Sequence, residues 1–303
     1  MAITMRTPDV GELDDAVRVL GTWQRDDGPV QLHPGDLGWF WRFGAERTAA
    51  AVRIWSRGGE ALAVGLLDGA ELLRLGVAPW ALGDEELARR IAADVAAPER
   101  GVLPGGEVYV AAPAGALVPE LLLAGGGWAL DEPWTPLRRD LSGPVPDPGV
   151  HVEVAGPGQV AERVAVQRSA FGSGSTFTEE RWRTMAAAPA YADARCLLAR
   201  NGRGEPVATV TVWSAGEGRA GLIEPMGVHA DHRGHGYGRA ITVAAAGTLR
   251  EMGASSVIVD TAAANSAAVA TYESAGLRRL PDMVDLRRTA AGATSAAAAR
   301  EGG

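Results

Sequence analysis

The sequence contains no lysine, so all 29 of its basic residues are arginines. A P-loop nucleotide-binding site requires a lysine that reaches the phosphates, and an enzyme that uses pyridoxal phosphate requires a lysine for its Schiff base. The absence of lysine therefore excludes both classes of protein.

The sequence also has a single cysteine, no long apolar run and no cluster of basic residues. Cys196 is the only cysteine, which excludes a disulfide, a thiolate zinc site and a redox pair, and its mid-strand position is typical of a small core residue. No apolar run reaches the roughly 18 residues of a membrane span, and the start MAITMRTPDV lacks the features of a signal peptide. We therefore expect a cytoplasmic protein with no membrane contact and no nucleic-acid partner.

The chain divides at a stretch with the composition of a linker. Residues 142–149, SGPVPDPG, carry three prolines and two glycines between two patterned regions. We expect one domain at 1–141, a second at 150–288, and a disordered, low-complexity tail at 289–303. The first of these regions has a net charge of −8 and the rest of the chain is neutral, so all of the net acidity lies in the first half.

The two halves repeat one pattern. GWALDEPWTPLRRDL (127–141) aligns without gaps with GLRRLPDMVDLRRTA (276–290). Further upstream, LGVAPWALGDEELARRI from Leu75 aligns with MGVHADHRGHGYGRAIT from Met226. These matches predict a duplication of one domain of about 140–150 residues.

The second copy alternates strand and helix patterns. We expect strands at 150–154, 194–200, 206–213, 220–228 and 255–260, helices at 159–171, from Thr178, at 237–252 and at 266–275, and a final strand pair. Antiparallel strands come first and a strand–helix–strand unit follows. This order predicts an α/β (α+β) fold, in which each copy is a mixed, mostly antiparallel sheet flanked by helices.

A glycine-rich loop lies between a strand and a helix of the second copy. Gly234, Gly236 and Gly238 alternate with other residues, and Arg233 and Arg239 flank them. Successive backbone N–H groups that open onto a helix N-terminus form a concavity for an anion, so we interpret the loop as a pyrophosphate cradle. Gly236 and Gly238 would allow positive φ and a close approach of the backbone. The alternative is a glycine-rich turn that binds nothing.

A dinucleotide-binding Rossmann loop is a second alternative. Asp260 ends the next strand about where a ribose-binding acid would lie. The spacing argues against this interpretation, because Arg239 occupies the position of the third glycine, which must pack helix against strand.

Two motifs resemble those of the GNAT acetyltransferase superfamily. The pattern Arg233-x-x-Gly236-x-Gly238 is similar to the acyl-CoA-binding motif of that family. NSAAVATYESAGL (265–277) is similar to its later helix, N-x-x-A-x-x-x-Y-x-x-x-G-F, with Leu277 in place of the aromatic residue. The motifs occur in the family's order and cover the second copy. The tandem layout, with the motif in the second copy only, is also similar to that of mycothiol synthase.

The resemblance implies that the second copy binds acetyl-CoA as an acyl-donor substrate. The family holds the thioester carbonyl with backbone N–H groups of the strand before the glycine loop. The residues implied in donor binding are Met226, Gly227, Val228, Arg233, Gly234, His235, Gly236, Tyr237, Gly238, Arg239, Asn265, Ala268 and Tyr272.

Amide formation from a thioester requires a base, because an amine is mostly ammonium at neutral pH. Glu224, on the strand that leads into the loop, is the candidate general base, and His229 is a second candidate. Pro225 removes a ladder donor, so we expect the strand to splay there. The resemblance places Tyr272 beside the thioester sulfur, as the donor of a proton to the leaving thiolate. The alternatives are a carboxylate in a salt bridge and a tyrosine that only packs.

Other candidate sites are weaker. The spacing of His229, His232 and His235 is typical of metal ligands, but a glycine-rich loop does not hold three imidazoles on one face, so we expect no metal. Five aromatic residues of the second copy could line an acceptor pocket, although most should be core: Phe171, Phe177, Trp182, Tyr191 and Trp213.

The first copy departs from the motif. Leu82, Glu85 and Leu87 align with Arg233, Gly236 and Gly238, and the acids at 84–86 lie where phosphates would bind. Carboxylates repel a polyanion, so we expect a scaffold domain that binds no coenzyme A.

We therefore predict an acetyl-CoA-dependent N-acetyltransferase that transfers an acetyl group to a small-molecule amine by direct attack. An aminosugar acetyltransferase similar to mycothiol synthase, or a non-catalytic acyl-CoA-binding regulatory protein, are the alternatives. We expect a monomer because the domains are in tandem, with a homodimer as the alternative.

Overall fold

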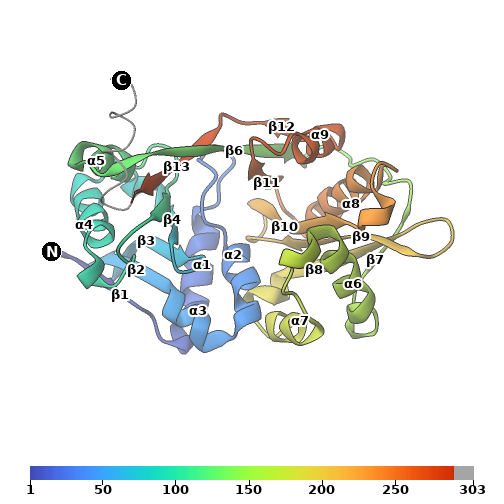
Figure 1. Cartoon of the computed structure of the whole chain (residues 1–303), viewed down its shortest axis with the longest axis horizontal. Helices are drawn as coiled ribbons and strands as arrows, with labels where there is room; N and C mark the ends of the chain where they lie inside the picture. The colour runs from blue at the N-terminus through green and yellow to red at the C-terminus, as the bar shows by residue number, and fades with distance from the viewer. Residues whose placement is uncertain (290–303) are drawn as a thin grey trace, which may run out of the picture.

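The computed structural model describes residues 1–289, so the predicted tail lies outside the described residues apart from its first residue. A sheet of 13 strands extends through the molecule, and helices pack on it (Figure 1). The elements of the first half are β1 (Ile3–Arg6), α1 (Leu13–Trp23), α2 (Pro34–Phe40), α3 (Ala45–Ala51), β2 (Val52–Arg57), β3 (Glu60–Leu67), β4 (Leu72–Val77), α4 (Glu85–Ala96), β5 (Val108–Ala111), α5 (Val118–Gly125) and β6 (Trp128–Asp140).

The second half follows the predicted order of elements. Its elements are β7 (His151–Val154), α6 (Val160–Phe171), α7 (Glu179–Ala186), β8 (Ala194–Arg200), β9 (Pro206–Trp213), β10 (Ala220–Val228), α8 (Tyr237–Glu251), β11 (Ser256–Ala262), α9 (Ser266–Ser274), β12 (Arg278–Arg279) and β13 (Met283–Arg288). The expected bounds of β8, β9 and β10 agree with the structure residue for residue. Most strand pairs are antiparallel, which confirms the fold class and excludes the Rossmann alternative.

The two halves exchange their last strands. The order across the sheet is β1-β2-β3-β4-β5-β13-β6-β11-β10-β9-β8-β7. The final strand of the second half, β13, therefore pairs with β5 of the first half, and β6 of the first half pairs with β11 of the second. Figure 1 shows β6 as a long strand that joins the two halves. The duplication predicted from the sequence thus forms one continuous sheet rather than two separate ones.

Helix α2 of the first half packs against Trp213 of the second half. The side of α2 that faces Trp213 carries Gly35 and Gly38, and a Cβ atom on either would overlap the Trp213 side chain. At the start of the same helix, His33 Nδ1 accepts a hydrogen bond from the backbone N–H of Gly35, which leaves Nε2 to donate to the carbonyl of Ala220 on β10 at 3.0 Å. Burial lowers the pKa of His33 to about 4, so the imidazole is neutral.

The sheet of the second half is covered on both faces. One apolar cluster, which includes Leu197, Ile241 and Tyr272, lies between the sheet and α8 and α9. A second cluster, which includes Cys196 and Trp182, lies under α6 and α7. Cys196 is fully buried, as expected of a core residue. No helix of residues 1–289 combines the length and apolar character needed to cross a membrane.

Candidate active site

Strands β10 and β11 separate at Glu224. They pair in parallel only over Ala220–Leu222, opposite 256–258, and the register of β10 against β9 shifts between Ile223 and Met226. Pro225 lies in this shift, where its missing N–H costs no ladder hydrogen bond. The structure thus confirms the splay predicted at Pro225, and the Glu224 side chain lies at the opening.

The glycine loop forms the N-terminus of α8. Gly234 has φ +78° and Gly236, the N-cap of the helix, has φ +81°, so the expected positive φ is confirmed at Gly236. Gly238 has no positive φ and serves close approach instead, because it lies inside α8, where a Cβ atom would come within 2.9 Å of the Thr271 side chain. Gly238 therefore permits α8 to approach α9.

Backbone donors of this loop are available to a ligand. Within residues 1–289, the N–H groups of Gly234, His235 and Gly236 donate to no protein acceptor, and space is open where a Cβ atom of Gly234 or Gly236 would lie. The N–H groups of the first helical turn after Gly236 are also free of intrahelical partners. A chain of such donors at the positive end of a helix fits the phosphates of acetyl-CoA, the substrate implied by the motif.

Polar side chains of the loop lie around these donors. Arg233 donates to the carbonyl of Ala170 at 2.7 Å and Arg239 to the carbonyl of Ser274 at 3.0 Å, and both are exposed at the rim of the loop. The His235 ring lies parallel to that of Tyr237, and its Nδ1 bonds to the carbonyl of Arg233. Within the part of the chain that the structure describes, no group of three or more His, Cys, Asp and Glu residues is arranged to hold a metal.

Helix α9 carries Tyr272, which packs in the apolar cluster of the second half and is not among the residues that line the cavity described below. Asn265 caps this helix by accepting a hydrogen bond from the backbone N–H of Ala268 at 3.2 Å, so both residues have a structural role, and their contact with the acyl donor stays a prediction. Tyr272 is only 7% exposed. Burial raises the pKa of Tyr272, and the nearby carboxylates of Glu224 and Asp260 raise it further, so the hydroxyl stays protonated at neutral pH.

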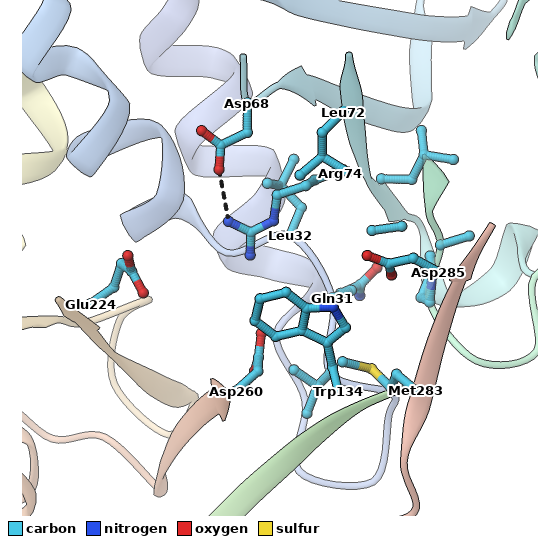
Figure 2. Close-up of a pocket in the computed structure, with 15 residues that line it drawn as sticks. Gln31, Leu32, Asp68, Leu72, Arg74, Trp134, Glu224, Asp260, Met283 and Asp285 are labelled. Carbon is cyan, nitrogen blue, oxygen red and sulfur yellow. Dashed lines mark ion pairs between the residues drawn. The ribbon is translucent and has the colours of Figure 1, made fainter. Parts of the chain in front are cut away.

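A cavity of about 220 Å³ opens beside Glu224 and lies between the two halves (Figure 2). Its walls come from both halves of the chain: Val30, Gln31, Leu32, Asp68, Leu72, Arg74, Leu75, Ala111, Ala112, Pro113, Trp134, Glu224, Asp260, Met283 and Asp285. The separation of β10 from β11 and the strand exchange around β13 and β6 together create this space.

The carboxyl groups of the cavity have raised pKa values. Burial, together with the negative field of Asp36, raises the pKa of Glu224 to about 7. Burial raises the pKa of Asp260 to about 6 and that of Asp285 to about 6, against the opposing effect of Arg74. A carboxylate with a pKa near 7 is suited to accept a proton at neutral pH. The salt-bridge alternative for Glu224 is wrong, because its side chain forms no ion pair within residues 1–289.

His229, the second candidate base, is placed differently. Its Nδ1 accepts a hydrogen bond from the backbone N–H of Asp231 at 3.3 Å and caps a short turn after β10. It is not among the residues that line the cavity. Glu224 is therefore the better placed of the two candidates.

The predicted acceptor aromatics do not line the cavity. Phe177, Trp182 and Trp213 are buried in the core, as expected for most of them. Phe171 is 51% exposed and lies against Gly227. The aromatic residue at the cavity is instead Trp134 of β6, which belongs to the first half.

Several cavity residues were missed by sequence reasoning. Arg74, Asp68 and Trp134 lie in the first half, and strand exchange brings them to Glu224. The concentration of acidic residues in the first half was the signal that could have directed attention to Asp68. No local pattern predicts which strand of one half pairs with which strand of the other.

The equivalent loop of the first half is filled by its own side chains. Asp84 caps α4 by accepting a hydrogen bond from the N–H of Leu87 at 3.0 Å. Arg57 bonds to Asp84 at 2.7 Å and to Glu86 at 2.8 Å. Carboxylates thus occupy the anion position of this helix, which supports the proposal that the first half binds no coenzyme A.

Comparison with known proteins assigns the second half. A model of the acetyltransferase (GNAT) family matches residues 165–277, a range that contains the splayed strand, the glycine loop and Tyr272. This segment of the second half is therefore similar to GNAT-family acetyltransferase domains. Acetyl transfer from acetyl-CoA is the general reaction of this family. Among curated proteins, no relative matches the sequence.

Solved structures of GNAT proteins share the fold over nearly the whole chain. A GCN5-related N-acetyltransferase from Sphaerobacter thermophilus has 21% identity and a TM-score of 0.56, with 94% of this chain and 95% of that chain covered. A tandem GNAT protein from the clavulanic acid biosynthesis pathway, solved without AcCoA, has 17% identity and a TM-score of 0.57, with 94% and 98% covered. A GNAT-family acetyltransferase from Colwellia psychrerythraea has 13% identity and a TM-score of 0.60, with 95% and 100% covered. The GNAT-like fold thus includes both halves.

Proposed function

We propose that the protein transfers the acetyl group of acetyl-CoA to the nitrogen of a small-molecule amine, with Glu224 as the general base. The observation that carries this proposal is the position of Glu224. Its carboxyl group lines the cavity at the point where β10 leaves β11, and its pKa is about 7. The cavity is accessible to an acceptor. The glycine loop of the donor site follows β10, the same strand that carries Glu224.

The reaction proceeds by direct attack. Glu224 removes a proton from the acceptor amine, and the nitrogen lone pair forms a bond to the thioester carbonyl carbon. Backbone N–H groups around Met226 and Gly227 polarise that carbonyl, as the family resemblance implies. The C–S bond then breaks, Tyr272 donates a hydrogen bond to the leaving thiolate, and the proton that the nitrogen loses on becoming an amide neutralises the thiolate. The products are an amide and free coenzyme A, so no covalent enzyme intermediate is needed.

The raised pKa of Tyr272 defines its role. A phenol is a weaker acid than a thiol, and burial makes this phenol weaker still. Complete transfer of its proton to the thiolate is therefore uphill. We propose that Tyr272 stabilises the developing thiolate mainly by donating a hydrogen bond, and that the thiolate is protonated as coenzyme A leaves.

A monomer is the proposed working unit. The exchanged strands β6 and β13 pair within one chain, so the cavity is complete without a second copy.

The test uses the full chain with acetyl-CoA and a panel of small amines that includes aminosugars. Release of free thiol, together with an acetylated amine detected by mass spectrometry, is the expected result. Glu224→Gln should lower kcat by about 10²- to 10⁴-fold and leave the Kd for acetyl-CoA unchanged. Binding of acetyl-CoA without turnover on any amine would favour the non-catalytic alternative.

A further inference from the structure

The cavity beside Glu224 has an excess of negative charge. Four carboxyl groups line it, and Arg74 is its one guanidinium group. Arg74 is already partnered, because it contacts Asp36 at 2.9 Å and Asp68 at 3.6 Å. Glu224, Asp260 and Asp285 form no ion pair within residues 1–289. The cavity therefore needs positive charge from its ligand and offers no free cation to a ligand carboxylate.

Asp260 lines the cavity and has no ion-pair partner in the described part of the chain. Its Oδ1 atom is inaccessible to solvent and accepts no hydrogen bond there, so this atom is closed to a ligand as well. A cation in the cavity would nevertheless offset the cost of this buried, unpaired carboxylate through its charge. Asp260 lies on β11, which belongs to the wall shared with Glu224 and Asp285.

The carboxyl groups are spread across the cavity rather than gathered at one point. Figure 2 shows Glu224 and Asp285 on opposite sides, with Trp134 between them and Asp260 below. Apolar side chains, including those of Leu32 and Leu72, form much of the remaining wall, together with the polar side chains of Gln31, Asp68 and Arg74. The arrangement fits a ligand with two separated cationic groups and an apolar chain between them.

The size of the cavity limits the ligand. About 220 Å³ is below the 300–1,000 Å³ typical of pockets for drug-sized molecules. An oligosaccharide would exceed this space.

We propose that the acceptor is a short aliphatic diamine, an inference that rests on the proposed function. One amine faces Glu224, loses its proton and is acetylated. The second amine remains an ammonium ion and binds the carboxylates of Asp285 and Asp260, while Trp134 packs against the methylene chain. The retained charge fixes the orientation of the acceptor.

The test compares three acceptors that differ in one charged group each. The probes are 1,4-diaminobutane, n-pentylamine, which has a methyl group in place of the second ammonium, and ornithine, which adds a carboxylate. We expect kcat/KM for the diamine to exceed that for n-pentylamine by about 10- to 100-fold, as for a hydrogen-bonded charge pair. Ornithine should be a poorer acceptor than the diamine, because its carboxylate meets an acidic wall.

Variants of Asp285 and Asp260 test whether these carboxylates cause the preference for the diamine over n-pentylamine. Asp285→Asn should lower the ratio of kcat/KM for the diamine to that for n-pentylamine by about tenfold, and Asp260→Asn provides a second, independent variant. Glu251→Gln removes one exposed carboxylate at the end of α8, away from the cavity, and should leave the ratio unchanged.

The outcomes separate this inference from the proposed function. Equal kcat/KM for diamine and n-pentylamine, or a clear preference for an aminosugar, would overturn the diamine while acetyl transfer stands. Calorimetric binding of the diamine that depends on Asp285, without any acetylation, would support the cavity assignment and contradict the proposed function.

Discussion

The indole Nε1 of Trp213 donates a hydrogen bond of 2.7 Å to the backbone carbonyl of Glu224. Trp213 itself is buried beneath the glycine face of α2, so the packing of the first half against the second fixes the strand that carries the candidate base. This contact connects the interface between the halves to the chemistry of the site.

Trp213→Phe should therefore lower kcat about fivefold without raising the KM for acetyl-CoA, because the lost hydrogen bond is worth about 1 kcal/mol. Trp182→Phe is the matched control. Trp182 is another buried tryptophan of the same cluster, and its indole N–H makes no hydrogen bond to β10. The measurement is steady-state kinetics on both variants. Equal loss of kcat in the two variants would show that ring volume, and not the bond to Glu224, matters.

The pH dependence of turnover should report the Glu224 carboxyl group. Its pKa of about 7 means that the proton-accepting form increases as the pH rises through 7, so kcat/KM should rise with pH and reach a plateau above about 8. Glu224→Gln should remove this ionisation from the residual activity. A pH profile that is flat between 6 and 8 in the wild type would contradict a base of this pKa.

The same carboxyl group should also appear in the stability of the protein without ligand. Because its pKa is higher in the folded state than in the unfolded chain, the folded state binds the proton more tightly, and stability falls as the pH rises from about 4.5 to 7. Glu224→Gln should be more stable than the wild type at pH 8, relative to their difference at pH 4, by up to about 3 kcal/mol. Denaturant unfolding of both proteins at the two pH values measures this difference.

Gly236→Val should weaken acetyl-CoA binding by about 100-fold or more. The residue has φ +81°, which a β-branched side chain adopts only with strain of about 1–3 kcal/mol, and the side chain would fill the cradle. Gly247→Ala is the matched control, since it lies within α8 and its new methyl group would be 3.9 Å from Val145. We expect it to stabilise the helix by about 0.5–1 kcal/mol and to leave binding unchanged. Calorimetry on the two folded variants distinguishes them, and an unchanged Kd in Gly236→Val would refute the phosphate cradle.

Tyr272→Phe should lower kcat by about 10²- to 10⁴-fold and barely change the affinity for acetyl-CoA. The hydroxyl is buried and protonated, and its loss removes the donor to the leaving thiolate while the ring continues to fill the core. Single-turnover kinetics with saturating acetyl-CoA measure this step. A folded variant that retains near-wild-type kcat would leave Tyr272 as a packing residue only.

Much of the second half could be predicted because its signals are local. Alternating apolar residues bounded by turn residues fixed the bounds of β8, β9 and β10, and Pro225 marked the position where β10 splays. The glycine spacing located the N-terminus of α8. The partner of Gly238 could not be predicted, because its close packing is against Thr271 of another helix.

The acceptor cavity could not be predicted because it depends on pairing between distant strands. Trp134 is far in sequence from Glu224, and nothing in its neighbourhood indicates that β6 crosses to β11. The raised pKa of Glu224 has in part the same origin, because burial raises it first and the charge of Asp36, from the other half, raises it further. A search limited to the second copy could find the donor site but not the acceptor site.

The strand exchange also determines when the protein can finish folding. The strand beside β5 on this side is β13, which spans Met283–Arg288 and is made more than 170 residues after β5. During synthesis from the N-terminus, the first half must therefore wait with this edge of β5 unpaired until β13 has been made. Such distant pairing is slow to form and exposes an apolar edge meanwhile. We expect nascent chains that stop before residue 283 to depend on chaperones.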